Sequence, residues 1–325
     1  MGRLRLNLTD KKADKRRFGE DELAYQLATI MTGEGPRAAM ILGDQAVEIA
    51  KATGQRSDET VLGILENLDA NLVRLDRLAA SKPAGLPLSK VQLLSPIPVP
   101  PAIYCAGSNY ADHAAEMAKA AGREPPKDPH DLGQRSWHFI KSSRSAIGTG
   151  ATIAIPEQTK KLDWEAELGV VIGKACRNVS EENALDYVAG YLVANDLSAR
   201  DLSRRNGVPE NSIFRNDWTA HKSFDGACPL GPWITLARDV KDPHDLKMRL
   251  SVNDVVKQDS NTSYMIFDIR EQIADLSGRM TLLPGDMILT GTPAGVGNGR
   301  GEYLKSGDVV KVSIEGLGEI INCFE

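Results

Sequence analysis

Residues 161–174 constrain the fold of this chain more than any other stretch, because they join two closely spaced carboxylates to an apolar run. The run at 168–172, Leu-Gly-Val-Val-Ile, is typical of a β-strand. Side chains alternate between the faces of a strand, so Glu165 and Glu167 should project from the same face. Two carboxylates so placed repel each other, and a divalent cation bound by their oxygens would relieve the repulsion. A solvated strand face is the simpler alternative, so a metal site needs support from elsewhere in the chain.

Composition excludes several classes of protein. The chain has 325 residues, 42% hydrophobic and 26% charged, with a net charge of -5. Such a chain can bury a substantial core, and its small negative charge favours neither nucleic acid nor an anionic membrane as partner. No apolar stretch approaches the ~20 residues of a membrane helix, and the N-terminus lacks the apolar core of a signal peptide. We therefore expect a cytoplasmic protein without a membrane partner.

The cysteines and the N-terminal basic residues carry no clear site. Cys105, Cys176, Cys228 and Cys323 lie far apart, without the paired spacing of a zinc ribbon or a redox dithiol, so we expect reduced thiols. Residues 1–20 form a basic arm. A basic arm can bind polyanions, but in a chain with an acidic remainder a solvated or oligomer-contacting tail is the simpler interpretation.

The first hundred residues predict a small unit of mixed structure. Residues 24–31 indicate a short helix. Two apolar runs between 38 and 50, separated by Gly-Asp-Gln, predict a β-hairpin. Apolar residues recur at helical spacing over 61–75 and predict a helix with one apolar face.

Prolines mark the end of this unit. Pro96, Pro98, Pro100 and Pro101 follow one another closely, and proline favours an extended backbone without a donor. We therefore divide the chain into two parts, 1–98 and 99–325.

A histidine and a glutamate come together early in the second part. A strand is expected at 103–107 and a helix at 111–121, on which His113 and Glu116 are three residues apart and share a face. Such a pair is usually a surface contact. If it faces a cavity, a carboxylate that orients the imidazole makes it a better base toward water.

A third carboxylate follows the next strand. Residues 188–194 predict a strand that ends at Asn195-Asp196, and a loop after a buried strand is a common place for a metal ligand. An N-cap role for Asp196 is the structural alternative. Arg200 follows one turn later, and residues 203–220 predict irregular backbone.

Two further segments could contact an anion. Lys222 lies among apolar and aromatic residues, where a cation could sit beside an anionic intermediate, although an exposed lysine is the simpler interpretation. The glycine-rich stretch 291–297 lacks the lysine and the spacing of a nucleotide-binding loop. Its backbone and the Thr292 hydroxyl could instead hold a small carboxylate. A hairpin is expected at 250–257, and two strands at 309–314 and 319–324 close the chain.

Five motifs in this order resemble the fumarylacetoacetate hydrolase family. They are Gly-Ser-Asn-Tyr-Ala-Asp-His-Ala-Ala-Glu at 107–116, Asp-Trp-Glu-Ala-Glu-Leu at 163–168, Asn-Asp-Leu-Ser-Ala-Arg-Asp at 195–201, Lys-Ser-Phe-Asp at 222–225 and Gly-Thr-Pro-Ala-Gly-Val-Gly at 291–297. The resemblance covers about residue 103 to the C-terminus, and the leading segment looks like the small N-terminal domain of many bacterial members.

The resemblance implies a fold and a set of site residues. The fold would be α+β and rich in strands, a mixed β-sandwich roll (99–325) with a small N-terminal α/β domain (1–98), usually assembled as a homodimer. The metal would be Mg²⁺ or Mn²⁺. The implied roles are metal ligands for Glu165, Glu167 and Asp196, a water-activating pair for His113 and Glu116, anion stabilisation for Lys222, and substrate binding for Arg200, Thr292, Ser108 and Tyr110.

The family also implies an activity. We expect a hydrolase that cleaves a C–C bond in a 2,4-diketo acid, acylpyruvate-like or a diketo-deoxy sugar acid, because a chelated divalent ion stabilises the enolate that the cleavage produces. The alternatives are a decarboxylase, a sugar-acid dehydratase or a keto–enol isomerase on the same site. A non-catalytic binding protein is disfavoured because every implied catalytic residue is present. Ser108 and Ser203 depart from the common family pattern, in which a basic residue and a glutamine stand at these positions.

Overall fold

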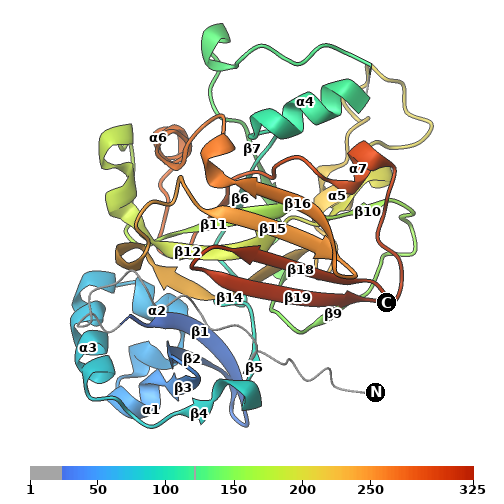
Figure 1. The fold of residues 1–325 in the computed structure, drawn as a ribbon. Coiled ribbons are helices and arrows are strands. Elements are labelled where there is room, and N and C mark those ends of the chain that lie inside the picture. Colours follow the sequence, from blue (N-terminus) through green and yellow to red (C-terminus); the bar gives the residue numbers. More distant parts are fainter. Residues whose placement is uncertain (1–23, 121) are drawn as a thin grey trace.

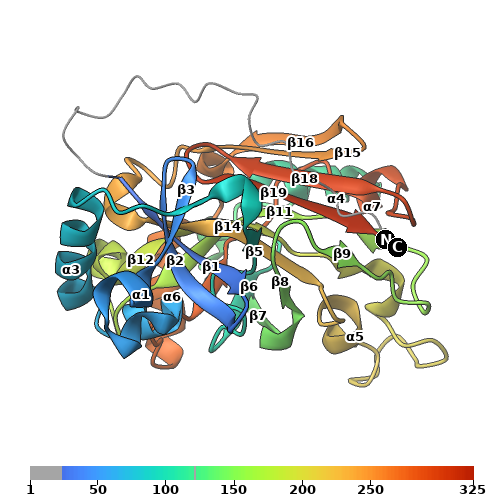
Figure 2. The same ribbon diagram turned by 90° about the horizontal axis from the view of Figure 1, so that it is seen from below.

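The computed structural model describes residues 24–120 and 122–325, so the predicted basic arm lies outside the described residues. Figures 1 and 2 show a strand-rich molecule with helices at its periphery. The expected class, α+β and rich in strands with a sandwich-like roll, is confirmed.

The strands of the described part form a 12-stranded sheet, a five-stranded sheet and a separate pair. The first contains β1 (Gln26–Thr32), β2 (Gly35–Leu42), β3 (Gln45–Glu48), β4 (Leu86–Pro87), β5 (Gln92–Leu93), β6 (Ile103–Ala106), β7 (His138–Lys141), β8 (Ala146–Ile147), β11 (Ala166–Ile172), β12 (Val188–Asn195), β14 (Cys228–Leu236) and β17 (Met287–Leu289). The second contains β9 (Thr152–Ile153), β15 (Lys247–Val252), β16 (Val255–Asn261), β18 (Val309–Ile314) and β19 (Gly318–Phe324). The pair is β10 (Leu162–Asp163) with β13 (Ser198–Ala199).

The helices accompany these sheets. They are α1 (Ile49–Thr53), α2 (Val61–Leu65), α3 (Leu68–Ala80), α4 (Ala111–Ala120), α5 (Trp218–Lys222), α6 (Ile269–Arg279) and α7 (Gly297–Arg300). Figure 1 shows α1 and α3 beside the N-terminal strands, and α4, α5 and α7 on the other side of the molecule.

Strand β11 is buried on both faces, which explains its continuous apolar sequence. Leu168 and Val170 belong to a core between the two sheets, which also contains Leu250 and Val312. Val171 faces the other way, into a second core. Glu165 and Glu167 are therefore both buried. The alternative interpretation, in which they lie on a solvated strand face, is wrong.

The second core joins the N-terminal segment to the rest of the molecule. Leu27 and Met40 pack in one cluster with Val171 and Leu289. Strand β1 also pairs with β14, which continues the main sheet into the N-terminal segment. The division of the chain at 98 and 99 stays a prediction.

Two local predictions in the N-terminal segment are corrected. The short helix predicted at 24–31 is wrong, because this stretch forms β1, whose backbone pairs with β2 and β14. Tertiary pairing here overrides local helix propensity. The helix predicted over 61–75 is divided into α2 and α3. The hairpin of β2 and β3 is confirmed.

In the second part, the hairpin of β15 and β16 and the final strands β18 and β19 are confirmed. Asn253 and Asp254 form the turn between β15 and β16 with positive φ angles of 50° and 63°, a conformation that Asn and Asp adopt more readily than most residues.

The four cysteines are free thiols. Within residues 24–120 and 122–325, no helix has the length and apolarity needed to cross a membrane.

Candidate active site

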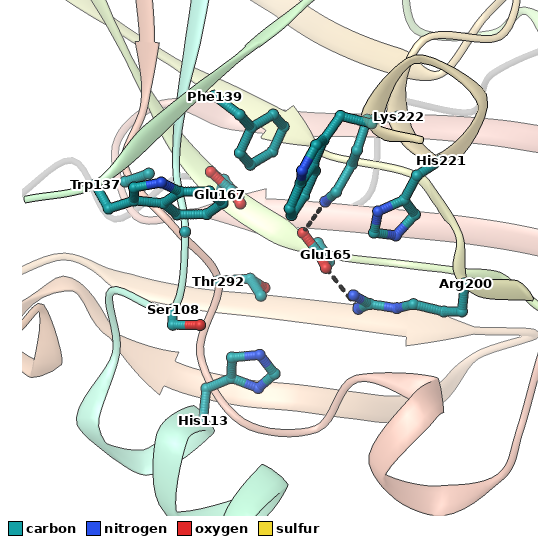
Figure 3. Close-up of a pocket in the computed structure, with 13 residues that line it drawn as sticks. Ser108, His113, Trp137, Phe139, Glu165, Glu167, Arg200, His221, Lys222 and Thr292 are labelled. Atoms are coloured by element: carbon teal, nitrogen blue, oxygen red, sulfur yellow. Dashed lines mark hydrogen bonds and ion pairs between the residues drawn. The ribbon is translucent and has the colours of Figure 1, made fainter. Parts of the chain in front are cut away.

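A cavity of about 100 Å³ brings together residues from both ends of the second part of the chain. Figure 3 shows its side chains pointing toward one another. The residues predicted from the sequence that line it are Ser108, His113, Glu165, Glu167, Arg200, Lys222 and Thr292.

Strand pairing brings the three predicted metal ligands together. Strands β11 and β12 are antiparallel, and Ala166 pairs with Asn195. This register places Asp196 next to Glu165, whose carbonyl oxygen accepts a 2.9 Å hydrogen bond from the Asp196 amide. The carboxylate oxygens of Glu165, Glu167 and Asp196 lie within 4.8 Å of one another, and all three residues are buried. The short helix that follows, Arg200–Leu202, has Ala199 at its N-cap, so Asp196 is not the N-cap.

Positive side chains surround these carboxylates. Lys222 Nζ lies 2.8 Å from Glu165 Oε2 and 2.6 Å from Asp196 Oδ2. Arg200 Nη2 donates to Glu165 Oε1 at 2.5 Å. Lys141, whose side chain is fully buried, donates to Asp196 Oδ1 and to the Leu197 carbonyl oxygen. Lys222 is thus a buried ion-pair partner and not an exposed lysine.

The two glutamates respond to this field in opposite ways. Burial opposes ionisation of Glu165, but Lys222 and Arg200 outweigh it and hold the pKa of Glu165 below its usual value. Burial raises the pKa of Glu167 well above its usual value, and the nearby Asp196 and Glu165 raise it further. Glu167 is therefore the carboxylate of the three that most lacks a positive partner.

These residues fit a hard divalent cation. Carboxylate oxygens are the ligands that Mg²⁺ and Mn²⁺ prefer. Four buried carboxylates, Asp163 and the three ligands, face three cationic side chains, Lys141, Arg200 and Lys222. With all seven groups ionised the site carries one excess negative charge, and a divalent cation, which would keep Glu167 ionised, would change this to one excess positive charge, which suits an anionic substrate.

Arg200 is held by two carboxylates. Its Nε donates to Asp163 Oδ2 at 2.8 Å, while Nη2 contacts Glu165. Asp163 is completely buried and also accepts hydrogen bonds from the amides of Trp164, Gly297 and Asn298. The guanidinium plane is therefore fixed beside the carboxylate group before any substrate binds.

Backbone amides of the glycine-rich loop donate hydrogen bonds to carboxylates of the protein itself. The Gly291 amide donates to Glu167 at 2.8 Å, the Gly295 amide to Glu116 at 2.9 Å, and the Gly297 amide to Asp163 at 2.6 Å. A side chain at Gly295 would collide with the Lys257 carbonyl oxygen at 2.1 Å, so the close approach requires glycine. The amides of Gly291, Gly295 and Gly297 are thus not available to a substrate carboxylate.

The Thr292 hydroxyl remains available to a ligand. Its oxygen accepts a 2.8 Å hydrogen bond from Gln258 Nε2. A hydroxyl has one hydrogen to donate, and this hydrogen bond leaves it free. Gln258 also accepts from the Ala166 amide, so one buried amide group aligns the loop with β11.

His113 lines the cavity from α4, and Glu116 follows it three residues later on the same face of the helix. The His113 ring contacts the carboxylate with 3.7 Å between Nδ1 and Oε2, and this nitrogen has no hydrogen-bond partner in the described part of the chain. Burial opposes ionisation of Glu116, but its interactions with His113 and the Gly295 amide outweigh burial and keep the pKa of Glu116 below its usual value. A charged carboxylate therefore stands next to the imidazole at neutral pH.

Ser108 and Tyr110 occupy different environments. Ser108 lines the cavity with a φ of 51°, a strained value for a residue other than glycine. Tyr110 is completely buried, and its hydroxyl lies 3.4 Å from Met248 Sδ. We therefore do not assign Tyr110 a direct contact with substrate.

Sequence reasoning missed much of the remaining wall. Trp137, Phe139 and Trp218 form an aromatic cluster, with ring centroids 5.1–5.8 Å apart. His221 and the buried Lys141 were missed as well. Trp218 and His221 lie three residues apart on α5, which begins within the stretch predicted to be irregular. The alternation of Trp137, Phe139 and Lys141 at the start of and along β7 was the available signal.

Comparisons with known proteins identify relatives of this chain. Residues 102–325 match the family described as fumarylacetoacetate (FAA) hydrolase, C-terminal. The human protein "Oxaloacetate tautomerase FAHD2B, mitochondrial" is 40% identical over 267 residues, 81% of this chain and 79% of that protein.

Two solved structures have the same fold. A putative HpcE protein from Mycobacterium smegmatis has a TM-score of 0.76 and 32% identity, covering 91% of this chain and 98% of that one. Maleylpyruvate hydrolase from Sphingobium sp. SYK-6, in complex with manganese(II) and pyruvate, has a TM-score of 0.71 and 31% identity, covering 92% and 98%. The chain belongs to the fumarylacetoacetate hydrolase family.

Proposed function

We propose that the protein is a divalent-metal-dependent enzyme that interconverts the keto and enol forms of a small 2-oxo diacid of the oxaloacetate type. The observation that carries the proposal is the cluster of Glu165, Glu167 and Asp196, whose oxygens lie within 4.8 Å at a cavity that His113 also lines. Glu165, Glu167 and Asp196 would hold Mg²⁺ or Mn²⁺. When bound, such an ion polarises a carbonyl and favours loss of the neighbouring proton.

His113 is the base in this proposal. Enolisation removes a proton from the carbon next to the carbonyl and places negative charge on the oxygen. A neutral imidazole accepts that proton, and Glu116 stabilises the resulting imidazolium. Lys222 and Arg200 lie near Glu165 and favour negative charge on the substrate oxygen. Return of a proton to the oxygen completes the enol.

The size of the cavity supports a small substrate. At about 100 Å³ it is smaller than the ~150 Å³ engineered cavity that admits benzene in another protein. A 2-oxo acid of three or four carbons is of suitable size. The human relative is named an oxaloacetate tautomerase, which agrees with this choice.

C–C bond hydrolysis of a 2,4-diketo acid, the activity expected from the sequence, is the second candidate. One observation favours it: His113 lines the cavity, and the Glu116 carboxylate lies 3.7 Å from its ring, so the pair could activate water. The maleylpyruvate hydrolase structure contains manganese and pyruvate, which is compatible with the same type of site. Both candidates share the enolate and differ in whether water attacks a second carbonyl.

One experiment separates the two. The Mg²⁺-loaded protein is incubated with the enol form of oxaloacetate and, separately, with acetylpyruvate, and the products are followed by absorbance and NMR. Accelerated conversion of oxaloacetate without new products from acetylpyruvate supports the tautomerase. Acetate and pyruvate from acetylpyruvate support the hydrolase. If neither reaction is accelerated, or if His113→Ala and chelator leave the rates unchanged, the proposal is wrong.

Three expectations from the sequence remain proposals. We propose Mg²⁺ as the physiological ion, a homodimer as the assembly, and the cytoplasm as the location. Inductively coupled plasma analysis, light scattering and cell fractionation test them in turn.

A further inference from the structure

His221 is a buried histidine at the wall of the cavity. Its exposed fraction is 6%, and neither ring nitrogen has a hydrogen-bond partner among the residues described. A buried polar group without a partner is unfavourable, and native proteins rarely retain one without a role. The ring lines the cavity, so a ligand there is the available partner.

The imidazole is neutral at physiological pH. Burial lowers the pKa of His221 to about 3, and the positive charges of Lys222 and Arg200 contribute to the decrease. A neutral ring has one N–H donor and one acceptor nitrogen. His221 can therefore donate a hydrogen bond without bringing a further charge into the site.

The position of His221 follows from α5. Trp218, His221 and Lys222 stand at positions i, i+3 and i+4 of this helix and so share the face that lines the cavity. Figure 3 shows His221 beside Lys222 and Arg200, while His113 projects from the opposite side of Glu165. A substrate whose reacting carbon faces His113 would thus present its other end to His221.

The other groups on this side favour an anion as the occupant. Lys222 and Arg200 are the charged neighbours named above, and the site gains an excess positive charge when a divalent cation is bound. The rim of the cavity is aromatic, with Trp137 49% exposed and Trp218 42% exposed. Trp218 packs against the His221 ring with 5.5 Å between centroids.

We infer that His221 donates a hydrogen bond to the distal carboxylate of the substrate and so makes the enzyme selective for diacids over monoacids. This inference rests on the proposed function, because it takes the other end of the substrate to be the 2-oxo acid group bound at the carboxylate cluster. His221 is then a specificity-determining residue, distinct from the base His113.

A matched pair of ligands tests the inference. (S)-malate and (S)-lactate share a 2-hydroxy acid head that can chelate a metal and cannot enolise, and they differ in the distal carboxylate. Binding of each to the Mn²⁺-loaded protein is measured by calorimetry for wild type, His221→Leu and His221→Gln. We expect His221→Leu to weaken malate binding about ten- to hundredfold, the range for a lost hydrogen bond to a charged group, and to leave lactate unchanged. His221→Gln, which keeps an N–H donor, should retain most of the malate affinity.

Controls separate the possible failures. His244→Gln changes a partly buried histidine that accepts a backbone hydrogen bond outside the cavity, and should alter neither affinity. His221→Leu should melt no lower than wild type, because it removes an unsatisfied buried group. Equal losses for both ligands, or no loss of malate affinity in either variant, would overturn the role of His221. Failure of wild type to bind Mn²⁺ or lactate would instead overturn the proposed function, and this inference with it.

Discussion

Lys222 and Glu165 form an ion pair inside the protein, with 2.8 Å between Nζ and Oε2. Glu165 is also a predicted metal ligand, so the ammonium group and a divalent cation would share one carboxylate. Lys222 balances the negative charge of Glu165 when no metal is bound, and it would also face the substrate. The ion pair therefore links the stability of the site to its chemistry.

Lys222→Met should therefore destabilise the metal-free protein more than the metal-loaded protein. Breaking a buried ion pair leaves an uncompensated charge and costs about 3–5 kcal/mol. Bound Mg²⁺ would supply part of the missing positive charge. Urea denaturation with and without saturating Mg²⁺ measures both values. Lys311→Met, which breaks the exposed pair with Asp254, is the control and should change the free energy of unfolding by no more than about 0.5 kcal/mol. Equal losses with and without Mg²⁺ would contradict this account.

Asp163→Asn should disturb Arg200 and the glycine-rich loop together. Asp163 accepts from Arg200 and from the Gly297 and Asn298 amides, and an asparagine NH₂ group cannot accept from them. We expect a loss of about 2–4 kcal/mol in the free energy of unfolding and a higher KM for the 2-oxo acid. Calorimetric melting and steady-state kinetics measure these effects. An unchanged KM would show that Asp163 does not position Arg200 for substrate binding.

Gly107→Ala should alter the cavity while leaving most of the fold intact. An added Cβ would lie 1.8 Å from a ring carbon of Trp137, so the indole must move. Trp137 is partly exposed and can shift into solvent, which limits the loss of stability to about 1–2 kcal/mol. Ligand titration followed by tryptophan fluorescence should show weaker binding. Wild-type affinity would mean that the aromatic rim does not contact the ligand.

His138 should make stability depend on pH below neutrality. Burial lowers the pKa of His138 from its ordinary value of 6.5 to about 4. Between these values the unfolded chain binds a proton that the folded protein does not, so stability falls as the pH decreases from 6.5 toward 4. His138→Gln removes this titration and should flatten the slope, by about 2 kcal/mol over the window. Urea denaturation at pH 7, 5.5 and 4.5 measures the effect, and an unchanged slope would contradict it.

The carboxylate cluster could be predicted in part because local patterns indicate its members. Period-two alternation places Glu165 and Glu167 on one face, and the end of a buried strand gives Asp196. The sequence does not contain the register of β11 and β12, which brings Asp196 next to Glu165. That register follows from long-range packing on both faces of the strands.

The missed residues depend on contacts between distant segments. The local sequence around Lys141 indicates only a strand. Its role follows from its hydrogen bond to Asp196, which lies 55 positions further along the chain. The helix expected at 24–31 failed for the same reason, since pairing of β1 with β14 outweighs local propensity. Tyr110 lies between Ser108 and His113, yet its side chain turns into the core.

The most direct test of the carboxylate cluster is a calorimetric titration of Mn²⁺ into wild type and Glu167→Gln. The substitution preserves shape and removes a carboxylate that repels Asp196 and Glu165, so the metal-free variant should be at least as stable as wild type. We predict one Mn²⁺ site per chain in wild type and an affinity roughly a hundredfold lower or worse in the variant, since even partners outside the coordination shell are worth 10–100-fold. A folded Glu167→Gln variant with wild-type Mn²⁺ affinity would contradict the assignment of the metal site.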